Sequence, residues 1–174
     1  MSVTIRQAEE QDREAIQQLY LSAFDANERE VVAALAIDLL DDDSLHIVAE
    51  QDEALVGHVS FSPVWNAATK EQIGWILAPL AVHPTNQKQG IGTQLVGAGI
   101  EFLKQQQAPL VFVYGDPDYY RRFGFSAELA QNTTAPYPLQ FPHGWQALRL
   151  TDKTSAATKC TIQCVAALSQ PSLW

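Results

Sequence analysis

The sequence is poor in basic residues. It has 11 lysines and arginines against 20 aspartates and glutamates, which gives a formal net charge of −9 at pH 7. Proteins that bind nucleic acid or anionic membranes draw much of their affinity from lysine and arginine on phosphate, so this balance argues against both partners. If a ligand of this chain is an anion, its positive partner must come from something other than a basic surface.

Long apolar runs and export signals are also missing. No stretch of about eighteen apolar residues occurs that could span a bilayer. The first residues, Met1–Arg6, lack the basic region and the apolar region that follow one another in an export signal. We therefore expect a cytoplasmic protein without a membrane partner.

Cysteine is scarce, and the two present, Cys160 and Cys164, lie close together in the sequence. On one strand they would share a face about 13 Å apart, which is too far for a disulfide. No pair of histidines accompanies them at the spacing of zinc ligands, so we expect no metal site.

The chain does contain enough apolar sequence for a folded core. Hydrophobic residues make up 47% and charged residues 18%, and 174 residues predict a single domain over residues 1–174. The hydrophobic periodicity predicts an α/β architecture around a mixed sheet, with Asn27 capping the second helix. The expected strands are 4–6, 45–50, 54–62, 72–82, 109–114, 145–150 and 159–166, and the expected helices are 10–24, 27–39, 90–106 and 116–123, with a loop over 131–143.

The most informative segment runs from Leu80 to Leu95, where a buried strand leads through a turn into a long helix. The first N–H groups of a helix have no partner within it and lie at the positive end of its dipole. Gly90 and Gly92 let a ligand approach this backbone closely, so the segment predicts a cradle for phosphate or pyrophosphate. A dinucleotide fingerprint would need a third glycine where Leu95 stands, and a P-loop would need Gly-Lys-Ser/Thr, so neither is present.

Two segments resemble a known family. Gln87-x-x-Gly90-x-Gly92, after a strand ending Leu80-Ala81-Val82, resembles the acyl-CoA pyrophosphate motif of the GCN5-related N-acetyltransferases (GNAT). Gly115–Phe125 resembles a signature of one bacterial branch of that family. The likeness covers about residues 3–126, and residues 127–174 match loosely. It implies a mostly antiparallel central sheet flanked by helices, whose central strand pair splays apart; Pro79 lies where that break is expected.

The resemblance also implies roles for particular residues. The Leu80 N–H would bind the thioester carbonyl and stabilise an oxyanion, and the Val82 backbone would hold the pantetheine arm of acetyl-CoA. Tyr120 would be the general acid that protonates the departing thiolate. The residues implied for the pyrophosphate are Gln87, Lys88, Gln89, Gly90, Ile91, Gly92 and Thr93.

The identity of the general base, which would take the proton from the attacking amine, stays open. Some members of the family carry a glutamate four residues before the Leu80 position, where this chain has Ile76. Glu71, His58 or a water chain to solvent are the alternatives.

The resemblance implies an enzyme that transfers acetyl from acetyl-CoA to a primary amine of a small molecule or protein, by direct attack in a ternary complex. The acidic charge favours a cationic amine. The alternatives are a non-catalytic acyl-CoA-binding or sensor module and a transferase for a longer acyl group. A monomer and a homodimer are both compatible with the sequence.

Overall fold

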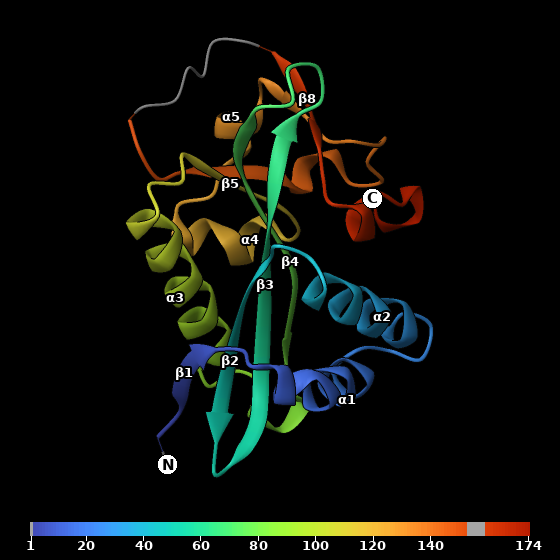
Figure 1. The fold of residues 1–174 in the computed structure, drawn as a ribbon, viewed down its shortest axis with the longest axis vertical. Coiled ribbons are helices and arrows are strands. Elements are labelled where there is room, and N and C mark those ends of the chain that lie inside the picture. The colour runs from blue at the N-terminus through green and yellow to red at the C-terminus, as the bar shows by residue number, and fades with distance from the viewer. Residues whose placement is uncertain (1, 153–158) are drawn as a thin grey trace. The chain divides into compact units, whose positions relative to one another are not determined.

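The computed structural model describes residues 2–152 and 159–174. The chain forms two compact units, and Figure 1 labels the main elements of both. Unit 1 comprises Met1–Phe61 and Ala78–Phe102, and unit 2 comprises Ser62–Leu77 and Leu103–Trp174.

Two strands, β3 (Ala54–Asn66) and β4 (Gln72–Val82), contribute residues to both units. The strand order is β1-β2-β3-β4-β5-β7, and β8 pairs with β3 and β6. Parallel pairing occurs between β4 and β5 and between β6 and β8. The expected α/β fold with a mixed, mostly antiparallel sheet is therefore confirmed.

Unit 1 contains the first half of the sheet and the long helices. In β1–β2 Thr4 lies opposite Glu50, and in β2–β3 His46 lies opposite Ser60, both in antiparallel register. The other elements that begin in this unit are β1 (Thr4–Gln7), α1 (Arg13–Ala23), α2 (Arg29–Leu40), β2 (Leu45–Gln51) and α3 (Ile91–Gln105).

The two faces of the unit 1 sheet are covered by different helices. Side chains alternate along a strand, so Gly57 and His58 of β3 face opposite sides. His58 contacts Tyr20 of α1. A Cβ on Gly57 would lie 2.8 Å from Leu95 Cδ1 of α3. The α1 face also includes α2 in one buried cluster, which consists of Ile16, Leu19, Tyr20, Ala33, Ala36, Val48 and Ala81.

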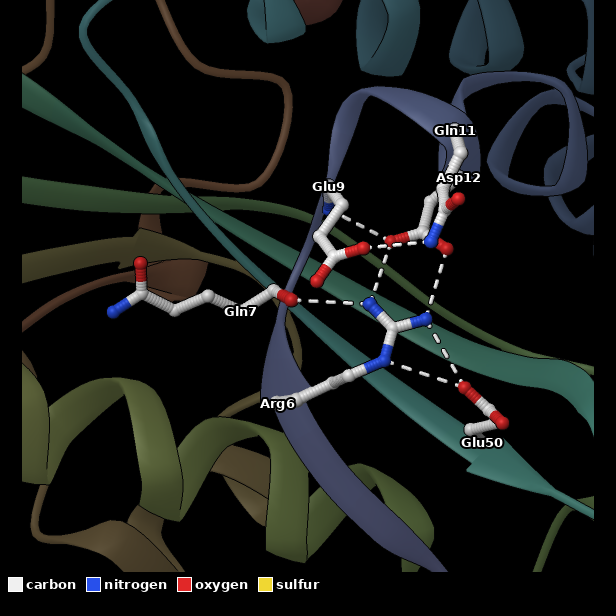
Figure 2. Close-up of polar contacts among 6 residues, drawn as sticks. All are labelled: Arg6, Gln7, Glu9, Gln11, Asp12 and Glu50. Atoms are coloured by element: carbon white, nitrogen blue, oxygen red, sulfur yellow. Dashed lines mark hydrogen bonds and ion pairs between the residues drawn. The ribbon is translucent and has the colours of Figure 1, made fainter.

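A group of ion pairs fixes the start of the chain to the sheet (Figure 2). Arg6 of β1 donates to both Asp12 oxygens, at 2.7 and 2.9 Å, and to Glu50 Oε2 of β2 at 3.0 Å. The Glu9 N–H also donates to Asp12, at 2.7 Å. The Arg6 hydrogen bonds hold the pKa of Asp12 below its usual range, so this buried carboxylate stays ionised.

Unit 2 holds the second half of the sheet and short helical turns. β4 runs parallel to β5 over Trp75–Leu77, and β5 runs antiparallel to β7 from Leu110 to Tyr114. The elements of this unit are β5 (Leu110–Tyr114), α4 (Pro117–Tyr120), α5 (Ala127–Ala130), β6 (Thr133–Thr134), β7 (Trp145–Arg149) and β8 (Cys160–Gln163).

Several predicted boundaries were wrong. The segment Glu10–Asp12 is a separate 3-10 turn before α1, and α2 is preceded by Glu28 rather than capped by Asn27. The last strand ends at Gln163, so Cys164 lies beyond it; both cysteines are free. The expected strand over 159–166 is therefore shorter, and Ala166 begins a 3-10 helix. The single-domain organisation stays a prediction.

None of the helices in the described ranges is long and apolar enough to cross a membrane. Within those same ranges, no group of three or more histidine, cysteine, aspartate or glutamate side chains is arranged to hold a metal ion.

Candidate functional site

The end of β4 is where the sequence predicts an interruption. The register between β4 and β5 ends at Leu77 opposite Val113. The peptide bond between Ala78 and Pro79, just beyond this pair, is cis. The strand itself continues to Val82. The end of the ladder agrees with the break in pairing expected at Pro79.

Beyond Pro79 the strand presents two donors along one edge. The His83 N–H donates to the Val56 carbonyl of β3 at 2.8 Å. N–H groups alternate along a strand, so those of Val82 and Leu80 are directed to the edge away from β3. These two donors are about 6.6 Å apart, the spacing that an extended amide-containing ligand matches when it adds to a sheet edge.

Side-chain hydrogen bonds brace the turn after β4. Gln87 Nε2 donates to the Val82 carbonyl at 3.1 Å, and Gln89 Nε2 donates to the Thr85 carbonyl at 3.2 Å. Asn86 Nδ2 donates to Gln51 Oε1 of β2 at 2.8 Å. The amide side chain of Gln87 thus closes the turn onto the strand end.

The first turn of α3 contains N–H groups without a helical acceptor. The first helical hydrogen bond is donated by Gln94 to the Gly90 carbonyl, at 3.1 Å. The N–H groups of residues 91–93 therefore precede the first donor that has a helical acceptor. Gly90 has φ 81° and Lys88 has φ 62°, so both lie in the left-handed region. Turns of this kind and helix N-termini are common binding positions for anions.

The cradle is open on one side and anchored on the other. Lys88, Gly90 and Thr93 are exposed, and no atom lies within 4 Å of a Cβ built on Gly90. Ile91 and Leu95 are buried and fix the first turns of α3 to the sheet. The buried side chains of Ile91 and Leu95 therefore hold the start of α3 in place.

Tyr120 lies in unit 2, in a group of aromatic rings. Its ring packs edge-on against Tyr119 and Phe125, with centroids 5.0 and 5.8 Å apart. A Cβ on Gly115 would lie 2.7 Å from Tyr120 Cε2, so only glycine leaves room for this ring. Burial, then the neighbouring Tyr119 and Asp116, raise the pKa of Tyr120 well above its usual value. The phenol stays protonated at neutral pH, as a proton donor must.

The alternatives for the general base lie in different surroundings. Glu71 is exposed in the turn between β3 and β4, where its carbonyl accepts the Asn66 N–H at 2.8 Å. His58 is fully buried and hydrogen-bonded at both ring nitrogens, to Tyr20 and to His46. Tyr20 and His46 were not predicted from the sequence as the partners of His58. His46 could have been found as a histidine at an inward-facing position of an apolar strand.

Comparison with known proteins identifies the family. A model described as the acetyltransferase (GNAT) family matches residues 11–125. This chain belongs to the GNAT family. The match includes Gln87–Thr93 and Tyr120, so the resemblance seen in the sequence is confirmed at the level of the family.

Two similar bacterial GNAT proteins extend this result. The chain is 32% identical over 143 residues to YjhQ of Escherichia coli K12, named as an uncharacterized N-acetyltransferase, covering 80% of this chain and 79% of YjhQ. The solved structure of Escherichia coli YhbS in complex with CoA has a TM-score of 0.86 at 28% identity, covering 97% of this chain and 92% of YhbS. The likeness in structure thus extends past residue 125.

A second solved GNAT structure, from Brucella melitensis in complex with acetyl-CoA, has a TM-score of 0.73 at 28% identity. The match covers 95% of this chain and 97% of the Brucella chain. Together these findings make the chain an acyl-CoA-dependent N-acetyltransferase by class.

Proposed function

We propose that this chain binds acetyl-CoA along the end of β4 and the start of α3 and transfers the acetyl group to a primary amine. The observation that carries the proposal is the cradle of N–H groups before Gln94, with Gly90 in the left-handed conformation. YhbS, whose fold is similar over nearly the whole chain, was solved with CoA.

The cradle also answers the question raised by the net charge. Helix N-terminal N–H groups supply positive potential without lysine or arginine, so a chain of net charge −9 can hold a pyrophosphate. In this proposal the backbone from Gln87 to Thr93 binds the phosphates, and the exposed Lys88 contributes a screened charge.

The outward N–H groups of β4 hold the rest of the cofactor. The Val82 backbone pairs with the pantetheine amides, and the Leu80 N–H donates to the thioester carbonyl. When an amine attacks that carbonyl carbon, negative charge develops on its oxygen, and the Leu80 N–H stabilises it. One such donor is typically worth about 3 kcal/mol in the transition state.

Collapse of the tetrahedral intermediate breaks the carbon–sulfur bond, and the sulfur takes a proton from the Tyr120 hydroxyl. The new carbon–nitrogen bond remains, the amine nitrogen gives its proton to water, and a proton from solvent restores the Tyr120 hydroxyl. Burial raises the pKa of Tyr120, which keeps its hydroxyl protonated but also makes it a weaker acid. Donation therefore requires that the departing thiolate be shielded from water as well, which raises its proton affinity. General-acid assistance of this kind is typically worth about 10²–10⁴ in rate.

Direct attack is favoured over an acetyl-cysteine intermediate. Burial raises the pKa of Cys164 to about 12 and also raises that of Cys160, so both thiols stay protonated and are weak nucleophiles. The acceptor is a small molecule or a protein amine, and the acidic charge favours a cationic one through steering.

The test is release of free CoA thiol from acetyl-CoA across a library of cationic, neutral and anionic amines, with butyryl-CoA as a parallel donor. We expect amine-dependent release that is fastest with acetyl-CoA and a cationic amine. Tight binding of acetyl-CoA without acceleration by any amine would instead identify a non-catalytic binding module. Faster turnover of butyryl-CoA would identify a transferase for longer acyl groups.

A further inference from the structure

A buried amide joins the two chain segments that meet at the end of the β5–β7 ladder. Gln146 of β7 is 1% exposed and lies opposite Val113 of β5. Its Nε2 group donates to the Gly115 carbonyl and to the Gly144 carbonyl, each at 3.2 Å. A side-chain amide carries two N–H donors, so one is available for each carbonyl. Burial of an amide is costly without hydrogen bonds, and these two bonds account for a polar residue at this position.

Gly115 is held at both its N–H and its carbonyl. The N–H donates to the Gly144 carbonyl at 3.0 Å, and the carbonyl accepts from Gln146. The β5–β7 register ends with Tyr114 opposite Trp145, so these bonds extend the connection one residue further. A Cβ on Gly144 would lie 3.0 Å from the Gly115 carbonyl oxygen, which shows how closely the two glycines pack. The position of Gly115 is thus fixed relative to β7.

The Tyr120 ring rests on Gly115. A Cβ built on Gly115 would lie 2.7 Å from Tyr120 Cε2 and 3.7 Å from Cζ, the carbon that bears the hydroxyl. The Tyr120 N–H donates to the Asp116 carbonyl at 3.1 Å. The ring also packs edge-on against Phe125. These contacts hold Tyr120 by its backbone and its ring, so the packing of the ring decides where the hydroxyl points.

A second support of the ring is anchored to the same strand. Phe125 is buried, and the next residue, Ser126, exchanges two backbone hydrogen bonds with Ala147 of β7, at 2.9 and 3.0 Å. Ala147 follows Gln146 directly in β7. Two neighbouring residues of β7 thus hold two supports of the Tyr120 ring. The link at Gln146 is made by a side chain, so a substitution can remove it.

We propose that Gln146 is a positioning residue for acetyl transfer, which holds Gly115 where it supports the Tyr120 ring and so directs the hydroxyl toward the departing sulfur. The inference rests on the proposed role of Tyr120 as the proton donor. Gln146 takes no part in the proton transfer itself, which moves a proton from the Tyr120 oxygen to the sulfur. A donor must lie within about 2.6–3.2 Å of its acceptor, and a displacement of about 1 Å can lower the rate by about 10².

The test is a double-mutant cycle of Gln146→Met and Tyr120→Phe, in which kcat and CoA affinity are measured for all four proteins. The donor is acetyl-CoA, and the acceptor is the amine that reacts fastest in the library. Methionine keeps the length of the side chain and removes both N–H donors. We expect Gln146→Met to lower kcat by about 10- to 100-fold when Tyr120 is present. In the Tyr120→Phe chain, where no hydroxyl can be misdirected, the loss should be less than about twofold. CoA affinity should stay within about twofold throughout.

Gly115→Ala gives the same test without removing the buried amide. The added Cβ would press on Tyr120 Cε2, so the ring must shift. We expect kcat to fall by about tenfold or more when Tyr120 is present, and by less than about twofold in the Tyr120→Phe chain. A loss of the same size in both chains would show that Gly115 does not act through the hydroxyl, and would overturn the proposal.

Gln163→Met is the matched control. It makes the same substitution on β8, another strand of unit 2, where the exposed Gln163 side chain accepts from Lys70 Nζ at 2.7 Å. We expect its kcat to stay within about twofold of wild type. A Gln146→Met loss that is equal with and without the Tyr120 hydroxyl would overturn the positioning role and leave acetyl transfer standing. Absence of transfer by the wild type with every amine would overturn both.

A second readout does not depend on activity. Crystal structures of the wild type, Gln146→Met and Gln163→Met compare the position of the Tyr120 ring directly. We expect the Tyr120 hydroxyl to move by about 1 Å or more in Gln146→Met and to keep its position in Gln163→Met. A Tyr120 hydroxyl that keeps its wild-type position in Gln146→Met would overturn the proposal.

Discussion

Gly90 offers the sharpest test of the phosphate cradle. Its φ is 81°, and no atom lies within 4 Å of a Cβ built there, so a side chain is opposed by backbone conformation and not by crowding. Holding a non-glycine residue in this region costs about 1–3 kcal/mol, and a β-branched residue is among the worst suited. In Gly90→Val we expect the turn to relax to a right-handed φ. This change would alter the position of the Gly90 N–H relative to those of residues 91–93.

If that cost must be met when CoA binds, affinity falls by about 5- to 150-fold. The assay is titration calorimetry with CoA, together with guanidinium unfolding to detect strain kept in the free protein. Gly97→Val is the matched control, because Gly97 lies in the same helix, is exposed, and has open space without a left-handed φ. Equal affinity of the two variants for CoA, with equal unfolding free energies, would refute the reasoning.

Three further predictions concern single side chains. Tyr120→Phe should lower kcat by about 10²–10⁴ while CoA affinity stays within about twofold; an unchanged kcat would make the tyrosine structural. Asp12→Ala should lower the unfolding free energy by about 2 kcal/mol at pH 7. The pKa of Asp12 is lower in the folded protein than the unfolded value near 3.9, so its contribution to the unfolding free energy is fully present above about pH 3.9. The difference in unfolding free energy between wild type and Asp12→Ala should therefore shrink as pH falls through the folded pKa. A difference that persists in acid would contradict this. Ser60→Ala should raise the unfolding free energy by about 1 kcal/mol in urea titration, and a loss would show that the hydroxyl is bonded.

The features predicted well from sequence are local ones. The order of strand, turn and helix from Leu80 to Leu95 could be predicted because these residues are consecutive. That the turn holds phosphate stays a prediction. The end of β4–β5 pairing at Pro79 could also be predicted, since a proline removes a donor wherever it stands.

The features that escaped prediction depend on distant residues. His46 and His58 meet because β2 and β3 pair in one register, and a shift of either strand by one residue would turn its histidine to the other face. Tyr20 joins them only because α1 packs on that face of the sheet. The predicted cap of α2 was wrong because the helix begins after Glu28, where the N–H groups of Glu28 and Arg29 donate to the Asp25 carbonyl of the preceding turn.

The central claim is that the start of α3 holds the pyrophosphate of acetyl-CoA while β4 presents the thioester. A crystal structure of the acetyl-CoA complex tests it most directly. We expect pyrophosphate oxygens within about 3.2 Å of N–H groups between Gln87 and Thr93, and the thioester oxygen at a similar distance from the Leu80 N–H. Phosphates bound elsewhere, or a thioester carbonyl without a β4 donor, would contradict the account.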